Sequence, residues 1–134
     1  MVIGIFGNIF RKPDQERILV GILKPFDKNK IQNDWVRIEQ LVQTAQPSAF
    51  KEAVIAADKL LDYALMQVSS GEAMGERLKN AYQSFPRDIY QGLWDAHKMR
   101  NALVHDPNFN LSVLMAREVI EKFKRGFQSL GARI

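Results

Sequence analysis

Three residues near the end of a predicted helix have side chains suited to phosphodiester chemistry. Arg100 and Asn101 are adjacent, and His105 follows after four intervening residues. An arginine guanidinium binds phosphate oxygens through paired N–H donors, and an imidazole exchanges protons near neutral pH. Side chains of these types could therefore stabilise the charge on a phosphorane and move the proton of a hydroxyl group, which are the two needs of phosphodiester cleavage.

The proline after this motif predicts where the helix ends. Pro107 has no backbone N–H and disfavours helical geometry at Asp106, so we expect the helix to end near Val104 or His105. On an ideal helix, Arg100 and His105 are separated by about 7.5 Å of rise and about 140° of rotation, which does not place both on one target. We expect the last turn to unwind and to bring His105 back toward the face of Arg100.

Three more titratable residues accompany the motif. His97 lies one turn before Arg100 on the same helix face, where a histidine is most often a hydrogen-bonded core residue. Asp58 and Asp62 are an i, i+4 pair at the edge of the apolar stripe of another predicted helix. Because a buried guanidinium needs a carboxylate, we expect either Asp58 or Asp62 to pair with Arg100.

We expect no metal ion and no other cofactor. The chain contains no cysteine, and its two histidines, His97 and His105, are not at the i, i+3 or i, i+4 spacing of a zinc pair. The Ser/Gly-containing stretch 69–75 lacks the Gly-Lys-Ser/Thr sequence of a phosphate-binding loop. Any chemistry at the Arg100 motif would therefore use side chains alone.

Apolar residues recur at helical spacing through most of the chain. Capping residues and helix breakers place the starts of the helices at Asn33 or Asp34, at Ser48, near Glu76, at Arg87 or Asp88, and at Asn110 or Ser112. After residue 30, no extended stretch alternates apolar and polar residues in the way that a half-buried β-strand does. Four amphipathic helices and one short helix, joined by brief loops, predict an all-α antiparallel helical bundle.

The apolar faces of these helices predict the core of the bundle. On the motif helix, we expect Leu93, Ala96 and Val104 to lie on the buried side, together with His97 and Arg100. The residues expected in a single buried cluster are Trp35, Phe50, Val54, Leu61, Leu93, Val119 and Phe123. At the end of the last helix, Gly131 is the expected C-terminal cap.

The first part of the chain differs in composition from the rest. Residues 1–30 carry six Lys/Arg and three Asp/Glu, whereas residues 31–134 carry 13 and 12. We therefore divide the chain into an N-terminal arm, 1–30, and a helical bundle, 31–134. Residues 1–10 are apolar, lack the charge order of a secretory signal and are too short to cross a bilayer as a helix. The arm either packs on protein or places residues 1–23 on a membrane surface.

The motif, in its all-helical context, resembles the HEPN domain family. Members share an Arg, a following polar residue and a His after about four to six intervening residues, a pattern matched by Arg100, Asn101 and His105. The resemblance covers about residues 31–134 and implies a homodimer in which the motif helix faces its copy. One toxin subgroup has a Tyr two residues after the His. Pro107 stands there in this sequence and argues against membership of that subgroup.

The resemblance also implies a function, metal-independent endoribonuclease activity, because many active family members have it. In that scheme His105 exchanges a proton with the 2′-OH or the leaving oxygen, Arg100 stabilises the phosphorane and Asn101 positions it. The alternative is a non-catalytic interaction module that binds a protein partner or, through its arm, a membrane. Both alternatives predict a cytoplasmic protein, in the second case one at the membrane periphery. A pI near 9.5 permits RNA binding, although the bundle itself is nearly neutral.

Overall fold

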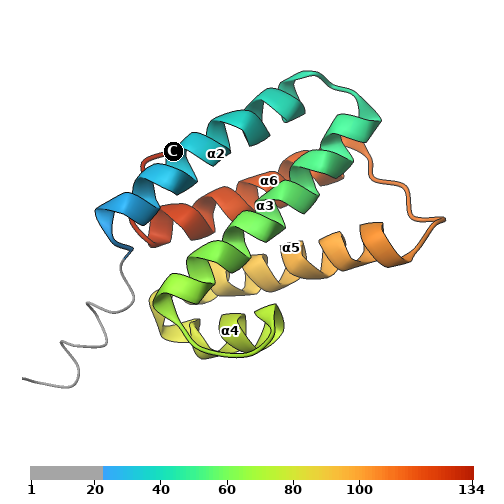
Figure 1. The fold of residues 1–134 in the computed structure, drawn as a ribbon. Helices are drawn as coiled ribbons and strands as arrows, with labels where there is room; N and C mark the ends of the chain where they lie inside the picture. Colours follow the sequence, from blue (N-terminus) through green and yellow to red (C-terminus); the bar gives the residue numbers. More distant parts are fainter. Residues whose placement is uncertain (1–22) are drawn as a thin grey trace, which may run out of the picture.

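The computed structural model describes residues 23–134 (Figure 1). Every regular element of this part of the chain is a helix, which confirms the predicted all-α class. In chain order the elements are α2 (Pro25–Gln43), α3 (Pro47–Val68), α4 (Met74–Asn80), a short 3-10 helix η1 (Tyr82–Ser84), α5 (Arg87–His105) and α6 (Val113–Ser129).

Helix α3 is the element around which the others pack. It contacts α2, α4, α5 and α6, and α5 packs in turn on α6. In Figure 1, α3 crosses the front of the bundle between α2 and α5, and α6 lies behind it. Helices α2 and α3 run antiparallel, as do α5 and α6. Side chains of α3 therefore meet residues of four other helices.

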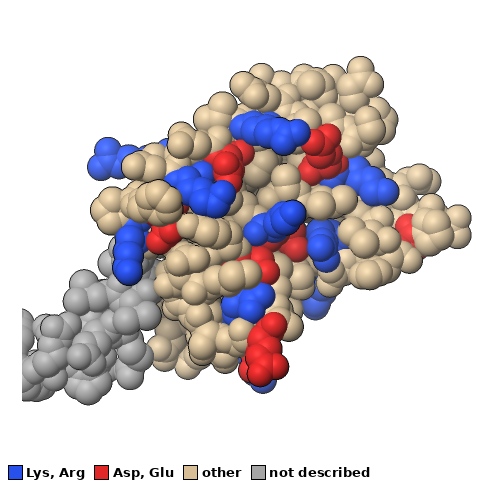
Figure 2. All heavy atoms as spheres, in the orientation of Figure 1, with Lys and Arg blue, Asp and Glu red and all other residues tan. Residues whose placement is uncertain are grey.

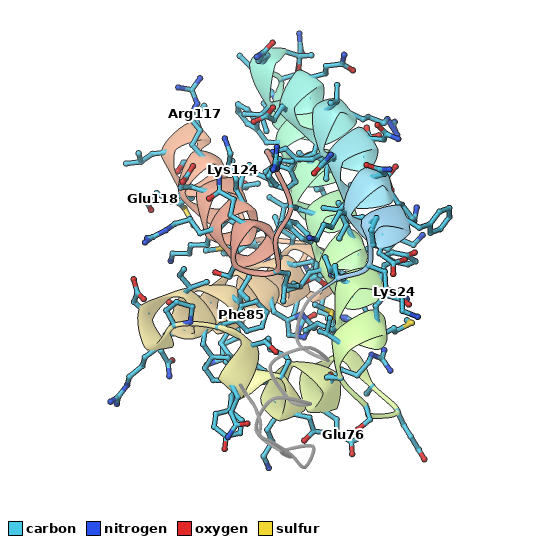
Figure 3. The ribbon with its side chains drawn as sticks, turned by 90° about the vertical axis from the view of Figure 1, so that its left-hand side faces the viewer. Lys24, Glu76, Phe85, Arg117, Glu118 and Lys124 are labelled. Atoms are coloured by element: carbon cyan, nitrogen blue, oxygen red, sulfur yellow. The ribbon has the colours of Figure 1, made fainter. Side chains whose placement is uncertain are left out.

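One apolar cluster fills the space between the helices. It includes six of the seven residues predicted for it, and the seventh, Phe50, is buried at 1% exposure but lies outside that cluster. Trp35 of α2 packs edge-on against Phe127 of α6, with 5.4 Å between ring centroids. Lys124 Nζ of α6 also lies 3.5 Å from Glu39 of α2, whereas Arg117 points away from the bundle (Figure 3). The core thus joins α2 and α6 as well as the directly adjacent pairs.

The buried face of α5 differs from the predicted one at its C-terminal end. Leu93, Ala96 and Leu103 are buried, but Val104 is 47% exposed. Near its N-terminal end, α5 approaches α6 closely at Gly126. A Cβ at that position would lie 2.6 Å from Leu93 Cδ2. The absence of a side chain at Gly126 therefore sets how closely α5 can lie against α6.

Two predicted helix starts are wrong, and each true start is a proline. Helix α2 begins at Pro25 rather than near Asn33, and α3 begins at Pro47 rather than after a Ser48 cap. A proline at the first helical position loses no hydrogen bond, because that N–H would have no partner in the helix. The predicted starts of the last two helices are confirmed at Arg87 and at Ser112, whose hydroxyl accepts a hydrogen bond from Met115 N–H.

The predicted boundary between arm and bundle falls inside α2. Leu23 is 3% exposed and its N–H donates to Leu130 O at 3.5 Å. Asp27 is buried and accepts a hydrogen bond from the Tyr63 hydroxyl. Residues 23–30 therefore belong to the bundle, and the rest of the predicted arm lies outside the described residues. Among residues 23–134, no helix combines the length and the hydropathy needed to cross a membrane.

Candidate functional site

A buried carboxylate on α3 organises the polar contacts between α3 and α5. Asp58 is 2% exposed. Its Oδ1 lies 3.0 Å from His97 Nδ1, and its Oδ2 lies 3.4 Å from Arg100 Nε. A carboxylate removed from water needs hydrogen-bonding or charged partners of this kind. The predicted pairing of Arg100 with a carboxylate of this helix is confirmed, and the partner is Asp58.

Arg100 is held less tightly than its distance from the carboxylate suggests. Its Nε is buried and makes no hydrogen bond, so its contact with Asp58 is an ion pair without directed hydrogen-bond geometry. Its Nη1 donates to Asn101 Oδ1 at 2.9 Å. The side chain is still 32% exposed. One edge of the guanidinium is thus anchored inside the bundle while another part of it reaches the surface.

His97 has the structural role that its helix position predicted. Its side chain is 13% exposed and its ring nitrogen is fixed by Asp58. The edge-to-face contact with Trp94, at 6.1 Å between ring centroids, holds the imidazole plane. With Asp58 held by His97, the carboxylate oxygen near Arg100 has a fixed position. His97 therefore orients the cluster from inside the bundle.

Asp62 does not contribute to the Asp58 cluster, although it was an alternative partner for Arg100. Arg77 of α4 binds it through two contacts, Nε to Oδ1 at 2.8 Å and Nη2 to Oδ2 at 3.0 Å. These hydrogen bonds raise the pKa of Arg77 above its ordinary value. The remaining Nη1 donates to Gly71 O at 2.8 Å. The sequence analysis did not predict a role for Arg77. The only signal for it in the sequence was a basic residue on the short helix after Gly71.

His105 lies apart from the Asp58 cluster. It is the last residue of α5 and is exposed. The predicted unwinding of this turn is wrong, because the helix is regular through His105 and the Asp106 N–H still donates to Ala102 O at 2.9 Å. Arg100 and His105 therefore keep their helical offset of about 140°, and they do not meet within one chain.

The cluster therefore provides an anchored, partly exposed cation at the surface rather than a complete acid–base pair. Asn101 lies beside this cation and adds an amide that can bind a neighbouring oxygen. No group of three or more His, Asp or Glu side chains within 23–134 is arranged to hold a metal ion. Comparisons with protein-family models, with characterised proteins and with solved structures found nothing that matches this chain.

Proposed function

We propose that the protein is a metal-independent endoribonuclease of the HEPN type, with a site completed across a homodimer. The observation that supports it is the state of Arg100, which Asp58 and Asn101 anchor while 32% of its side chain stays exposed. A guanidinium held by an ion pair and partly open at a surface can bind the two non-bridging oxygens of a phosphodiester. Since His105 points elsewhere in the same chain, the proton-transfer group would come from the second copy.

The proposed reaction uses the nucleophile that RNA itself supplies. His105 of one copy takes the proton of the 2′-OH, and the 2′ oxygen bonds to the adjacent phosphorus. Arg100 of the other copy stabilises the charge that develops on the phosphorane oxygens, and Asn101 keeps the guanidinium in place. The bond from phosphorus to the 5′ oxygen then breaks, that oxygen takes a proton from water, and the protonated His105 returns its proton to the solvent. The products are a 2′,3′-cyclic phosphate and a free 5′-OH.

The test is cleavage of labelled RNA in the presence of a chelator, with analysis of the ends. Arg100→Ala and His105→Ala should each lower the rate by about 100-fold or more, whereas Arg117→Ala on the outer surface of α6 should not. An equal mixture of Arg100→Ala and His105→Ala proteins, unfolded and refolded together, should recover part of the activity. Only a site built from two copies regains one intact pair in this way.

Two results would contradict the proposal. Wild-type protein that leaves varied single-stranded and structured RNAs intact would rule out the proposed ribonuclease activity. If the mixed dimer recovers no activity, a site shared between two copies is ruled out. The matched control is a mixture of either variant with a protein carrying both substitutions, which contains no complete pair.

The alternative, a non-catalytic interaction module, is favoured by a different feature of the Asp58 cluster. The carboxylate serves His97 and Arg100 at once and joins α3 to α5, so the cluster stabilises the bundle whether or not RNA binds. In that case Arg100→Ala would lower only the free energy of unfolding. The wild-type protein would then bind a partner without cleaving RNA.

A further inference from the structure

A groove between α2 and α3 is separate from the Asp58 cluster. Its volume is about 420 Å³, and neither Asp58 nor any residue of α5 lines it. Sites for small organic ligands commonly have volumes of about 300–1,000 Å³, so the groove is large enough for a modest ligand. What it would bind follows from the chemistry of its floor and its rim.

The floor of the groove is apolar and well ordered by the packing below it. Ile38 is 2% exposed and Leu60 is 5% exposed, so they support the floor from below, and the partly buried Ala56 supplies open apolar area. The Tyr63 ring forms one wall. Its hydroxyl donates to the buried Asp27, which fixes the position of the ring. An apolar ligand group would find a preformed surface here and would release water from it.

The rim of the groove carries an excess of positive charge. Lys30, Arg37 and Lys59 line it together with one carboxylate, Asp34. Figure 2 shows basic and acidic side chains over the face formed by α2 and α3. Lys59 makes no ion pair with any residue in 23–134, so its charge is available to a ligand.

The two other rim cations are paired, but only weakly. Lys30 lies 2.9 Å from Asp34 and Arg37 lies 2.8 Å from Glu52, and all four side chains are more than 40% exposed. Exposed ion pairs of this kind contribute about 0–1 kcal/mol, so an arriving anion can exchange partners with them at little cost. The groove therefore combines an apolar floor with one free cation and two exchangeable ones.

We propose that this groove binds a small amphipathic organic anion, with its apolar body on Ala56 and Tyr63, above the buried Ile38 and Leu60, and its acidic group at Lys59. An inorganic anion would leave the apolar floor hydrated, and an uncharged apolar ligand would leave the rim charge unused. A free carboxylate with an alkyl or aromatic body satisfies both parts. The site does not depend on the proposed ribonuclease activity, because no residue of the Asp58 cluster lines it.

The test uses the full chain and decanoate as the probe. Isothermal titration should show saturable binding, and amide NMR shifts should be concentrated at Ala56 and Leu60. Lys59→Glu should weaken binding by about tenfold or more. Lys51→Glu is the matched control, because it makes the same charge change on an exposed position of α3 outside the groove. It should alter the affinity by less than about twofold, since charges beyond a Debye length are screened.

A second variant keeps the proposal testable if the charge reversal disturbs folding. Lys59→Gln removes the charge with little change of shape and should still weaken decanoate binding. Decylammonium, with the same alkyl chain and the opposite charge, should bind more weakly than decanoate. Circular dichroism on each variant establishes that it is folded before its affinity is measured.

Several outcomes would overturn the proposal. These are no saturable binding of decanoate or 1-naphthoate, equal loss of affinity in the Lys59 and Lys51 variants, or decylammonium binding as tight as that of decanoate. NMR shifts at Ala56 and Leu60 caused by an RNA oligonucleotide but not by decanoate would assign the groove to a polyanion. Binding to anionic phospholipid vesicles without binding to free decanoate would assign it to a lipid surface.

Discussion

Two arginine–aspartate pairs attach neighbouring helices to α3, and they use their charges differently. Asp62 and Asp58 lie one turn apart on α3, and they pair with Arg77 of α4 and Arg100 of α5. Arg77 makes two hydrogen bonds to its carboxylate and a third to the Gly71 carbonyl, and its side chain is 12% exposed. Arg100 makes one hydrogen bond, to Asn101, and is 32% exposed.

The difference separates a structural arginine from one that can bind a ligand. Each of the three guanidinium nitrogens of Arg77 donates a hydrogen bond within the fold and the side chain is 12% exposed, so a new anion would compete with existing partners. Arg100 shares its carboxylate with His97 and keeps part of its guanidinium at the surface. Two aspartates one turn apart on α3 thus form one closed site and one open site, with arginines from α4 and α5.

Removal of the carboxylates should give the largest effects on stability. Asp58→Ala leaves both His97 and Arg100 without their acid, and we expect a loss of about 3–5 kcal/mol in the free energy of unfolding. Asp62→Ala leaves one arginine without its acid. Because the Asp62 side chain is already 23% exposed, we expect a smaller loss, about 2 kcal/mol in the free energy of unfolding. Urea unfolding followed by circular dichroism measures both. An equal or larger loss for Asp62→Ala would show that Asp58 is not the more important acid.

Removal of the arginines should give smaller losses in the opposite order. Arg77→Ala leaves Asp62 and the Gly71 carbonyl without donors, at a cost of about 1–2 kcal/mol, because water can reach the partly exposed carboxylate. Arg100→Ala should cost about 1 kcal/mol, because Asp58 keeps His97. RNA binding should reverse the ranking, with Arg100→Ala losing most of the affinity and folded Arg77→Ala losing little. Filter binding below the unfolding temperature of each variant checks this. Similar RNA affinities for both would remove the distinction between the two arginines.

The sequence predicts the fold class well because its patterns are local. The helical spacing of apolar residues, the Ser112 cap and the Pro107 stop each depend on a few neighbouring residues, and each was identified correctly. Helix starts at Pro25 and Pro47 were missed because a proline can either end one helix or begin the next. At Pro25, the packing of Leu23 and Asp27 against the bundle decides between these two interpretations.

The candidate site could be predicted in composition but not in pairing. Asp58 and Asp62 are equivalent in sequence pattern, and the choice between them depends on how the turn at Gly71 brings Arg77 onto α3. Gly71 has a φ of 148°, a conformation that few other residues adopt. The position of His105 likewise depends on whether the last turn of α5 stays helical, and the spacing of residues in the sequence does not specify this.

A substitution at the contact between α5 and α6 should disturb the Asp58–Arg100 pair and leave the Asp62–Arg77 pair in place. Gly126→Ala places a Cβ 2.6 Å from Leu93 Cδ2, so either the Leu93 side chain or α5 as a whole has to shift. We expect a net loss of about 1 kcal/mol, since overpacking costs about 1–3 kcal/mol and alanine favours the helix by up to about 1 kcal/mol. In side-chain NMR spectra, the Arg100 Nε–H signal should shift while that of Arg77 stays in place. Equal shifts at both would mean that α4 moves with α5.

The smallest expected effect comes from a third contact between α3 and an acidic side chain, in which α3 supplies an uncharged hydroxyl donor. The Tyr63 hydroxyl donates to Asp27 of α2, and this hydrogen bond, with some burial, raises the pKa of Tyr63 above its ordinary value. Only the neutral phenol can donate. The contribution of this contact to stability is therefore complete below about pH 10, the unfolded-state value, and is lost as the pH rises through the higher folded-state pKa.

Thermal unfolding of the wild type and of Tyr63→Phe on either side of that pH measures the effect. The difference between them should shrink above about pH 10, because the wild type loses the donor that the variant already lacks. The difference between the wild type and Arg77→Ala should not shrink in that range, since Asp62 raises the pKa of Arg77 still further above its ordinary value and the guanidinium stays charged. A Tyr63→Phe difference that stays constant through this pH range would mean that the hydroxyl does not hold Asp27. Parallel losses in both variants would instead indicate a general alkaline loosening of the bundle, unrelated to either contact.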